Sequence, residues 1–268
     1  RGLEVFLSSN FYDDHHKLID YNGYKIEHSH IVPVEEGRHI VDFSITKNVA
    51  SMFVSVALLF LVFFSVRKGY SKNDGRAPKG IQSFFEPIII FIRDEVARPN
   101  IGDKYEKFLP YLLTIFFFIW FNNLMGLFPG SANVTGNIAV TGTLAIFTFV
   151  ITQLSGNKQY WQHIFNTPGV PWWLKIPLPI MPVVELIGVF TKPFSLTVRL
   201  FANITAGHII ILSLFSLIFI FQSIWVGPLS VAFAVFMFFL ELFVALLQAF
   251  IFTILSAMYF GAAVEDHH

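Results

Sequence analysis

The sequence predicts an all-α membrane protein. Five helices are expected to cross the bilayer, two of them long, tilted and joined in a hairpin, and one further amphipathic helix is expected in the membrane interface. Two observations predict this class. The chain has 268 residues, of which 54% are hydrophobic and 13% charged, whereas a soluble domain averages about 25% charged residues. Its apolar residues also form continuous segments, several of them as long as the roughly 20 residues that cross a bilayer as a helix.

Charge and cysteine content exclude several functions. Basic and acidic side chains balance at 18 each, so the chain offers no polycationic surface and we expect no nucleic-acid partner. The sequence contains no cysteine, which excludes disulfides, thiolate nucleophiles and cysteine-ligated metals. No motif for a cofactor stands out, and we expect none.

The first 47 residues are polar and mixed, and they cannot span a membrane. The short alternating run from Tyr24 to Val34 permits one or two strands. Asp13 to His16 could be drawn as a metal site, but no pattern fixes a coordination geometry, so we interpret this stretch as solvated and predict no metal. We expect residues 1–47 to form a polar segment on the extracytoplasmic side.

The first membrane helix is predicted over residues 48–66, which are almost uninterruptedly apolar. Residues 67–80 follow with five basic residues and one acidic residue, which places this loop in the cytoplasm and the N-terminus outside by the positive-inside rule. Over residues 81–98, apolar side chains recur at three- and four-residue spacing among charged ones, which is typical of an interfacial helix. Residues 67–107 are therefore predicted to be a cytoplasmic basic loop with an interfacial helix.

The second and third membrane helices are predicted over residues 105–128 and 138–154, in a membrane region that we place at 108–154. The turn between them carries no charge, which suits the outer face. The loop at 155–182 contains two lysines, several aromatic residues and five prolines. Its basic residues and tryptophans place it in the cytoplasm, like the first basic loop.

The last membrane region, residues 183–262, is too long for two upright helices. Residues 183–222 would reach about 60 Å as a helix, roughly twice the hydrocarbon thickness. Pro193 predicts a kink rather than an end, because membrane helices tolerate proline. The first clear turn is Gly227-Pro228, so the region is predicted to be a long tilted helical hairpin, followed by a tail at 263–268.

Polar side chains interrupt this hairpin in a helical pattern. A charge at the centre of a membrane helix costs about 3 kcal/mol, so these residues are functional candidates. Residues seven apart share one face of a helix. One such stripe contains Glu185, Lys192 and Arg199, with Ser195 and Asn203 four residues to either side of Arg199, and a second contains Glu241 and Gln248.

His208 lies nine residues beyond Arg199, about 13.5 Å along the axis and on roughly the opposite face. We therefore expect Arg199 and His208 to face different neighbours. An internal ion pair that fixes helix packing is the architectural explanation of Arg199. The dispersal of Glu, His, Asn and Gln over several depths favours a proton or ion path instead. For Asn133, in the uncharged turn, a capping role and a functional role are equally supported.

Three motifs in this chain resemble signatures of subunit a of the rotary F-type ATP synthase. The first is Lys-Pro-Phe-Ser-Leu-Thr-Val-Arg-Leu-Phe-Ala-Asn from Lys192 to Asn203, followed by Ala206-Gly207. The second is Gln-Ala-Phe-Ile-Phe from Gln248. The third is Asn-Leu-Met-Gly-Leu-Phe-Pro from Asn123, with Asn-Val-Thr from Asn133. The resemblance covers roughly residues 48–262 and leaves the first 47 residues out.

The resemblance implies the stator half of a proton-driven rotary motor. Such a subunit binds no nucleotide and is not an enzyme on its own. Its partners would be the ring of c subunits, the b subunits of the peripheral stalk, the rest of the ATP synthase complex and the lipid bilayer. Two aqueous half-channels, one open to each side, would end at the ring. Arg199 would lie between them, hold the passing ring carboxylate deprotonated and block a direct proton leak.

The other roles follow from the resemblance position by position. Asn203 and Gln248 would flank Arg199 at the ring contact, with Ser195 on the same proton path. His208 and Glu241 would line the outer half-channel as a facing pair that titrates as one unit. Glu185 would lie near the mouth of the inner half-channel. Asn133 would join the path at a position where the family commonly has a carboxylate.

Two other interpretations stay open at this stage. The chain could be a stand-alone ion channel or secondary transporter with a buried Arg/Glu/His site, although no inverted repeat is visible. It could also be a structural membrane scaffold. The resemblance leaves the ion, proton or sodium, open because the ring carboxylate belongs to another chain. We expect a multi-pass protein of the bacterial inner membrane with its C-terminus in the cytoplasm; the mitochondrial inner membrane is the alternative.

Overall fold

A computed structural model describes residues 4–13, 17–27, 30–34, 40, 44–72, 77–127, 134–165, 180–221 and 226–265. The chain divides into two compact units, Arg1–Thr46 and Lys47–His268.

The N-terminal unit contains a short antiparallel sheet. Strands β1 (Tyr24–Glu27) and β2 (His30–Pro33) pair with Tyr24 opposite Pro33, which confirms the strands expected between Tyr24 and Val34. Asn22 and Gly23 lead into β1 with φ of 52° and 78°, a conformation that asparagine and glycine adopt more readily than other residues. The core is a cluster of aromatic rings whose contacting centroids are 5.4–6.0 Å apart, made by Phe6, Phe11, Tyr21 and Tyr24.

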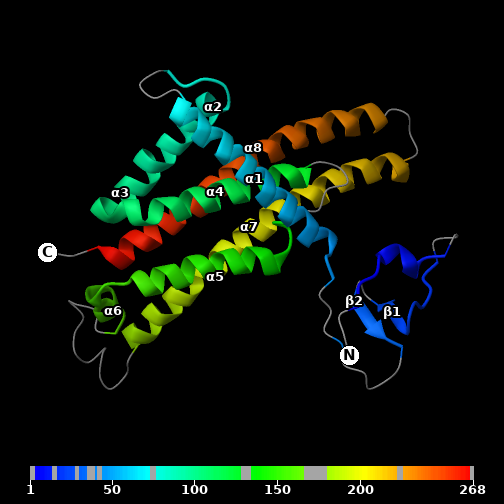
Figure 1. Cartoon of the computed structure of the whole chain (residues 1–268), viewed down its shortest axis with the longest axis horizontal. Helices are drawn as coiled ribbons and strands as arrows, with labels where there is room; N and C mark the ends of the chain where they lie inside the picture. Colours follow the sequence, from blue (N-terminus) through cyan, green and yellow to red (C-terminus); the bar gives the residue numbers. More distant parts are fainter. Residues whose placement is uncertain are drawn as a thin grey trace. The chain divides into compact units, whose positions relative to one another are not determined.

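The second unit is helical throughout its regular structure (Figure 1). Five of its described helical stretches are long and apolar enough to cross a membrane, which confirms the predicted class: Lys47–Ser71, Ile81–Leu127, Ile138–Ser155, Val183–Phe221 and Gly227–Val264. The helices are α1 (Lys47–Lys72), α2 (Ile81–Phe91), α3 (Arg98–Ile101), α4 (Tyr105–Leu127), α5 (Ile138–Ser155), α6 (Lys158–Phe165), α7 (Ile180–Phe221) and α8 (Val226–Val264).

Several boundaries differ from those predicted. Helix α1 continues through the basic residues up to Lys72, since charge ends a membrane span but not a helix. A π-helical segment, Ile92–Ala97, joins α2 to α3, so the stretch predicted as an interfacial helix is continuously helical from Ile81 to Ile101. Its apolar stretch runs on to Leu127, and its placement in the interface stays a prediction. Helix α6, inside the predicted loop at 155–182, has only two turns and was not foreseen.

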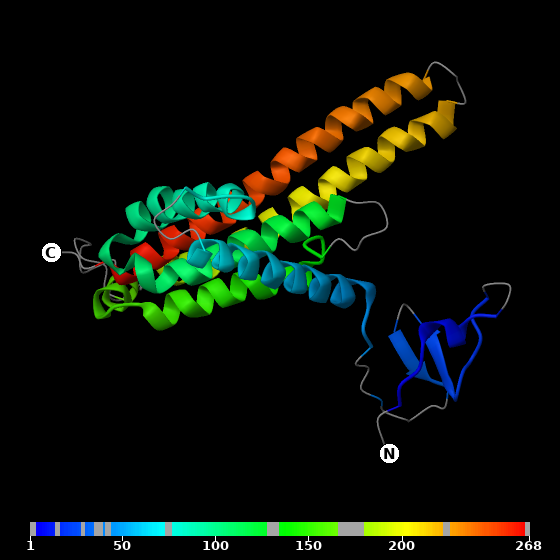
Figure 2. The same ribbon diagram turned by 45° about the horizontal axis from the view of Figure 1, so that its top comes forward.

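Helix α8 is at the centre of the bundle. It packs against α4, α7, α3 and α5, while α7 lies between α5 and α8 (Figures 1 and 2). Aromatic rings of α4 fill the core beside it: Phe108 stacks on Phe260 of α8 with centroids 4.8 Å apart, and Phe117 meets Phe63 of α1 at 4.9 Å. Large rings of this kind bury much apolar surface, which fixes the depth of α4 against its neighbours.

The C-terminal end of α8 is held by two connecting segments. Lys104 Nζ donates a hydrogen bond to the Val264 carbonyl over 3.1 Å, and Asn157 Nδ2 donates to the same oxygen over 3.0 Å. The Asn157 backbone amide donates to the Ala263 carbonyl over 2.9 Å. These bonds satisfy carbonyls that the end of a helix leaves without an internal partner.

Beside this end, Gln153 Nε2 donates to the Tyr160 hydroxyl over 3.1 Å. Burial raises the pKa of Tyr160 above its ordinary value, and the hydrogen bond from Gln153 opposes part of that shift. The Tyr160 hydroxyl therefore stays protonated, because a buried phenolate would be costly to form. The bond attaches α6 to the end of α5.

Helices α7 and α8 have 42 and 39 residues, so each is about 60 Å long. In Figure 2 their connected ends, in yellow and orange, extend past the ends of α4 and α5. Pro193 lies inside α7 without ending it, as predicted, and the Thr197 hydroxyl donates to the Pro193 carbonyl over 2.9 Å. A bilayer accommodates helices of this length by tilting, kinking or local thickening, and the tilt stays a prediction.

Candidate functional site

The predicted site residues gather on the two long helices. Helix α7 carries Glu185, Ser195, Arg199, Asn203 and His208, and α8 carries Glu241 and Gln248. Asn133 lies outside the described residues. Because α7 and α8 pack against each other, Asn203 meets Gln248 and His208 lies near Glu241.

Asn203 and Gln248 connect the two helices directly. Asn203 Nδ2 donates to Gln248 Oε1 over 2.7 Å. The Gln248 side chain is only 1% exposed, and its Nε2 has no hydrogen-bond partner among the described residues. A buried donor without a partner costs about 1–3 kcal/mol. This unpaired amide therefore marks a polar position inside an apolar bundle.

Glu241 lies against the backbone of α7 at Gly207. A Cβ atom built on Gly207 would lie 2.9 Å from Glu241 Cδ and 3.1 Å from its Cγ, so the glycine leaves the space that the carboxyl side chain occupies. Glu241 Oε1 is buried and has no hydrogen-bond partner among the described residues. His208, the next residue of α7, lies within electrostatic range of this carboxylate. The structure thus places His208 near Glu241, its predicted partner, but no hydrogen bond joins the two side chains directly.

Arg199 is exposed on the surface of α7, whereas Leu196 and Leu200 beside it in the sequence are buried. None of the ion pairs found among the described residues includes Arg199. The architectural explanation, an ion pair that fixes helix packing, therefore has no support in the part of the chain that the structure describes. Three residues with short side chains lie near Arg199 on this side of α7: Ser195, Ala202 and Ala206.

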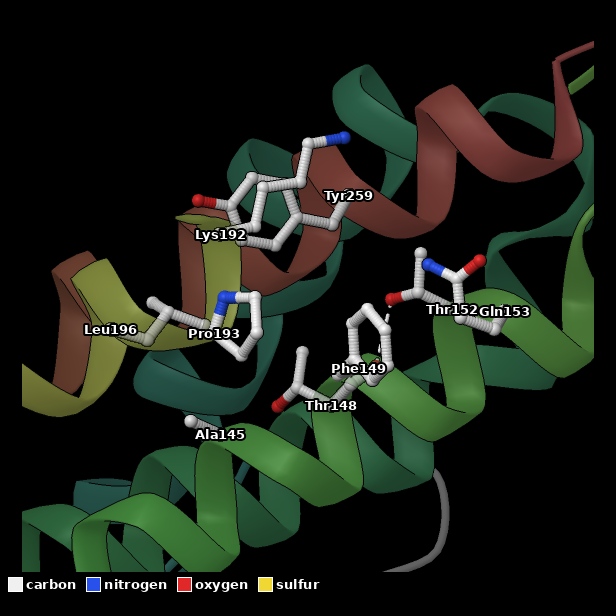
Figure 3. A pocket seen from close by; sticks show the side chains of 9 residues that line it. All are labelled: Ala145, Thr148, Phe149, Thr152, Gln153, Lys192, Pro193, Leu196 and Tyr259. Atoms are coloured by element: carbon white, nitrogen blue, oxygen red, sulfur yellow. Dashed lines mark hydrogen bonds between the residues drawn. The ribbon is translucent and has the colours of Figure 1, made fainter. Parts of the chain in front are cut away.

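The two charged residues that precede Arg199 on α7, Glu185 and Lys192, have different surroundings. Lys192 Nζ lies 5.2 Å from the ring centroid of Tyr259 on α8, a cation–π geometry that shelters the charge. Figure 3 shows both residues at a cavity of about 10 Å³ between α5, α7 and α8, roughly the volume that one water molecule needs. Glu185 is partly buried and lies within electrostatic range of Lys192.

The polar stripe on α7 is only partly covered by α8. Asn203 and Lys192 contact Gln248 and Tyr259 of α8, whereas Arg199 stays exposed. Sequence reasoning gave no role to Gly207 or Tyr259. Gly207 carried one usable signal, since a glycine in a membrane helix often marks close helix approach. Tyr259 carried none, because its neighbour Lys192 is distant in the sequence.

The sequence of this chain is similar to those of known proteins. Residues 49–261 match the family described as ATP synthase A chain. The chain is 48% identical over 263 residues to ATP synthase subunit a of Chloroherpeton thalassium, an alignment that covers 94% of this chain and 77% of the relative. It is 52% identical over 236 residues to ATP synthase subunit a 2 of Chlorobaculum tepidum (85% and 66%) and 52% identical over 235 residues to that of Prosthecochloris aestuarii (84% and 71%).

The family match includes three of the five apolar helical stretches entirely and the first and last almost entirely, and it includes every described candidate residue on α7 and α8. The chain spans 66–77% of the length of these three relatives. This multi-pass membrane protein therefore belongs to the ATP synthase A chain family.

Proposed function

We propose that this chain is the proton-translocating stator subunit a of an F-type ATP synthase, with two aqueous half-channels that end at a ring of c subunits. The observation that carries the proposal is Arg199, an exposed arginine without an ion-pair partner among the described residues, on a long and largely apolar helix. A cation in this position requires a partner outside the chain. A membrane carboxylate on each ring subunit would be that partner.

The surface around Arg199 supports contact with another helix. Ser195, Ala202 and Ala206 carry short side chains there, and small residues let helix backbones approach closely in membranes. A ring helix packed over the small residues would bring its carboxylate to Arg199.

The polar groups on either side of Arg199 would form the two half-channels. Towards the α7–α8 connection lie His208 and Glu241, whose buried Oε1 has unused hydrogen-bonding capacity; this end would open to the outside. Towards the start of α7 lies Glu185, which would be near the mouth of the inner half-channel. Asn203 and Gln248 would flank Arg199 at the ring contact, with Ser195 beside it. Arg199 would separate the two paths because its charge repels a proton that passes directly.

The orientation rests on charge. Residues 67–80 hold five basic residues and one acidic residue, so this loop and the C-terminus would lie in the cytoplasm and the N-terminal unit outside. The relatives come from bacteria, which favours the bacterial inner membrane. The b subunits of the peripheral stalk would be further partners.

Purification of the native complex tests the proposal directly. We expect a tag on this chain to recover a c-ring and the nucleotide-binding subunits from detergent-solubilised membranes. Liposomes that contain the recovered complex should make ATP from ADP and phosphate when an acid–base jump is applied. Recovery of the chain alone, together with proton or ion flux through liposomes that contain no other subunit, would instead identify a stand-alone channel.

Exchange of His208 and Glu241 tests the outer half-channel. We expect the double variant His208→Glu/Glu241→His to retain more ATP-driven proton pumping than either single variant, because the exchange keeps one carboxyl and one imidazole beside Gly207. The measurement is quenching of a pH-sensitive dye in inverted membrane vesicles, analysed as a double-mutant cycle. Equal losses in the double and single variants would show that the two groups do not work as a pair.

A further inference from the structure

Asn123 of α4 holds α8 at a position between two site residues. Its side chain is 1% exposed, and its Nδ2 donates a hydrogen bond over 3.1 Å to the backbone carbonyl of Ala245. Ala245 follows Glu241 by four residues and precedes Gln248 by three. These three residues therefore share one face of α8. A hydrogen bond to the backbone at their centre fixes both the rotation and the height of that face.

Two unused groups lie in the same region. Asn123 Oδ1 and Gln248 Nε2 are both buried and have no hydrogen-bond partner among the described residues. Gln248 Oε1 already accepts from Asn203. Asn123 thus attaches a third helix, α4, to α8 three residues from the side chain that α8 offers to α7.

We propose that Asn123 is a positioning residue, which holds α8 in the register where Gln248 meets Asn203 and Glu241 meets Gly207. This inference rests on the proposed function, because Asn203, Gln248 and Glu241 matter for transport only if protons pass along them. Asn123 itself touches neither the ring nor the reacting carboxylate; it acts through the α8 backbone. Loss of its hydrogen bond would let α8 rotate or slide, and the two contacts with α7 would then loosen together.

The neighbouring Asn122 is a matched control. It is also fully buried, and its Oδ1 also has no partner among the described residues. Its Nδ2, however, donates to the Phe118 carbonyl of its own helix over 2.7 Å. Replacement of Asn122 therefore removes the same chemical group from the same helix without releasing α8. A difference between the two positions measures the contact with α8 alone.

The test uses the complete ATP synthase complex with Asn123→Leu and, separately, Asn122→Leu. Because this chain contains no cysteine, spin labels can be introduced at the exposed residues Ser216 of α7 and Val235 of α8, with thiols on the other subunits removed. We expect Asn123→Leu to widen the distance distribution between the labels and to lower ATP-driven proton pumping about tenfold, the scale of one lost buried hydrogen bond. We expect Asn122→Leu to change neither.

The isosteric variant Asn123→Asp keeps the proposal testable if Asn123→Leu fails to assemble. A buried carboxyl has a raised pKa; when protonated it can donate to Ala245, and when ionised it cannot. Pumping relative to wild type should therefore be higher at pH 6 than at pH 9. Equal effects at positions 122 and 123, unchanged label distances in Asn123→Leu, or a flat pH ratio in Asn123→Asp would overturn the inference. Widened distances with full pumping would support positioning and contradict the proposed function of Asn203, Glu241 and Gln248.

Discussion

Replacement of Arg199 by Ala or Gln is expected to abolish proton-driven ATP synthesis while the complex still assembles. Assembly should survive because Arg199 is exposed and takes part in none of the ion pairs formed by the described residues. Synthesis should fail because the ring carboxylate loses the charge that keeps it ionised at the boundary between the half-channels. Two unit charges 4 Å apart attract by about 4 kcal/mol at an effective dielectric constant of 20, which corresponds to roughly a thousandfold change in an equilibrium constant.

The measurement is ATP synthesis by inverted vesicles under a proton gradient, with the amount of assembled complex determined in the same membranes. Lys192→Gln is a suitable control, because it removes a cation from the same stripe of α7 but one that lies over the Tyr259 ring. We expect this control to retain most of its activity. Normal synthesis in Arg199→Ala would contradict the rotary-motor proposal, and loss of the assembled complex would show that Arg199 has a structural partner.

The class of the fold follows from the sequence because the bilayer imposes it. Helices of about 20 apolar residues are the simplest structure that satisfies every backbone group in hydrocarbon, so hydropathy alone places the apolar stretches. The short helix α6 and the π-helical segment Ile92–Ala97 depend on local packing instead. No residue type marks a π-helical turn, and a helix of two turns has too few residues for a clear period.

The candidate residues of the site could be predicted from the sequence, but only some of the contacts between them could. A helical wheel gives the angle of Asn203 or His208 around α7, and the cost of polar groups in hydrocarbon explains why they stand out. The wheel does not say which neighbour occupies each angle. The bond from Asn203 to Gln248 and the space that Gly207 leaves for Glu241 depend on how α8 packs on α7. The hydrogen bond from Asn123 to the Ala245 carbonyl of α8 joins residues 122 positions apart, which no local pattern can indicate.

Gly261 is the position where the anchoring of α8 is most sensitive to substitution. A Cβ atom built there would lie 2.9 Å from the carbonyl carbon of Asn100 and closer still to its oxygen, with Ile101 Cα at 3.6 Å. These are backbone atoms of α3, so no rotation of a side chain can relieve the contact. Asn100 is itself fixed, since its Nδ2 donates to the Val96 carbonyl over 2.8 Å. A methyl group at position 261 must therefore push α8 away from α3.

Gly261→Ala is accordingly expected to destabilise the subunit by about 3 kcal/mol, the upper range for an overpacked core, and to lower its amount in membranes several-fold. The hydrogen bonds from Lys104 and Asn157 to the Val264 carbonyl would be strained by the same shift. Gly227→Ala, at the other end of the same helix, meets nothing within 4 Å and should leave the amount unchanged.

The measurement is immunoblotting of the membrane fraction together with protease resistance of the solubilised complex. Equal amounts of the two variants would mean that α8 does not approach α3 as closely as the backbone contact at Gly261 requires. Because α8 also carries Glu241 and Gln248, any Gly261→Ala complex that does assemble should pump protons poorly, since a helix released at its C-terminal end cannot hold those side chains at fixed positions against α7.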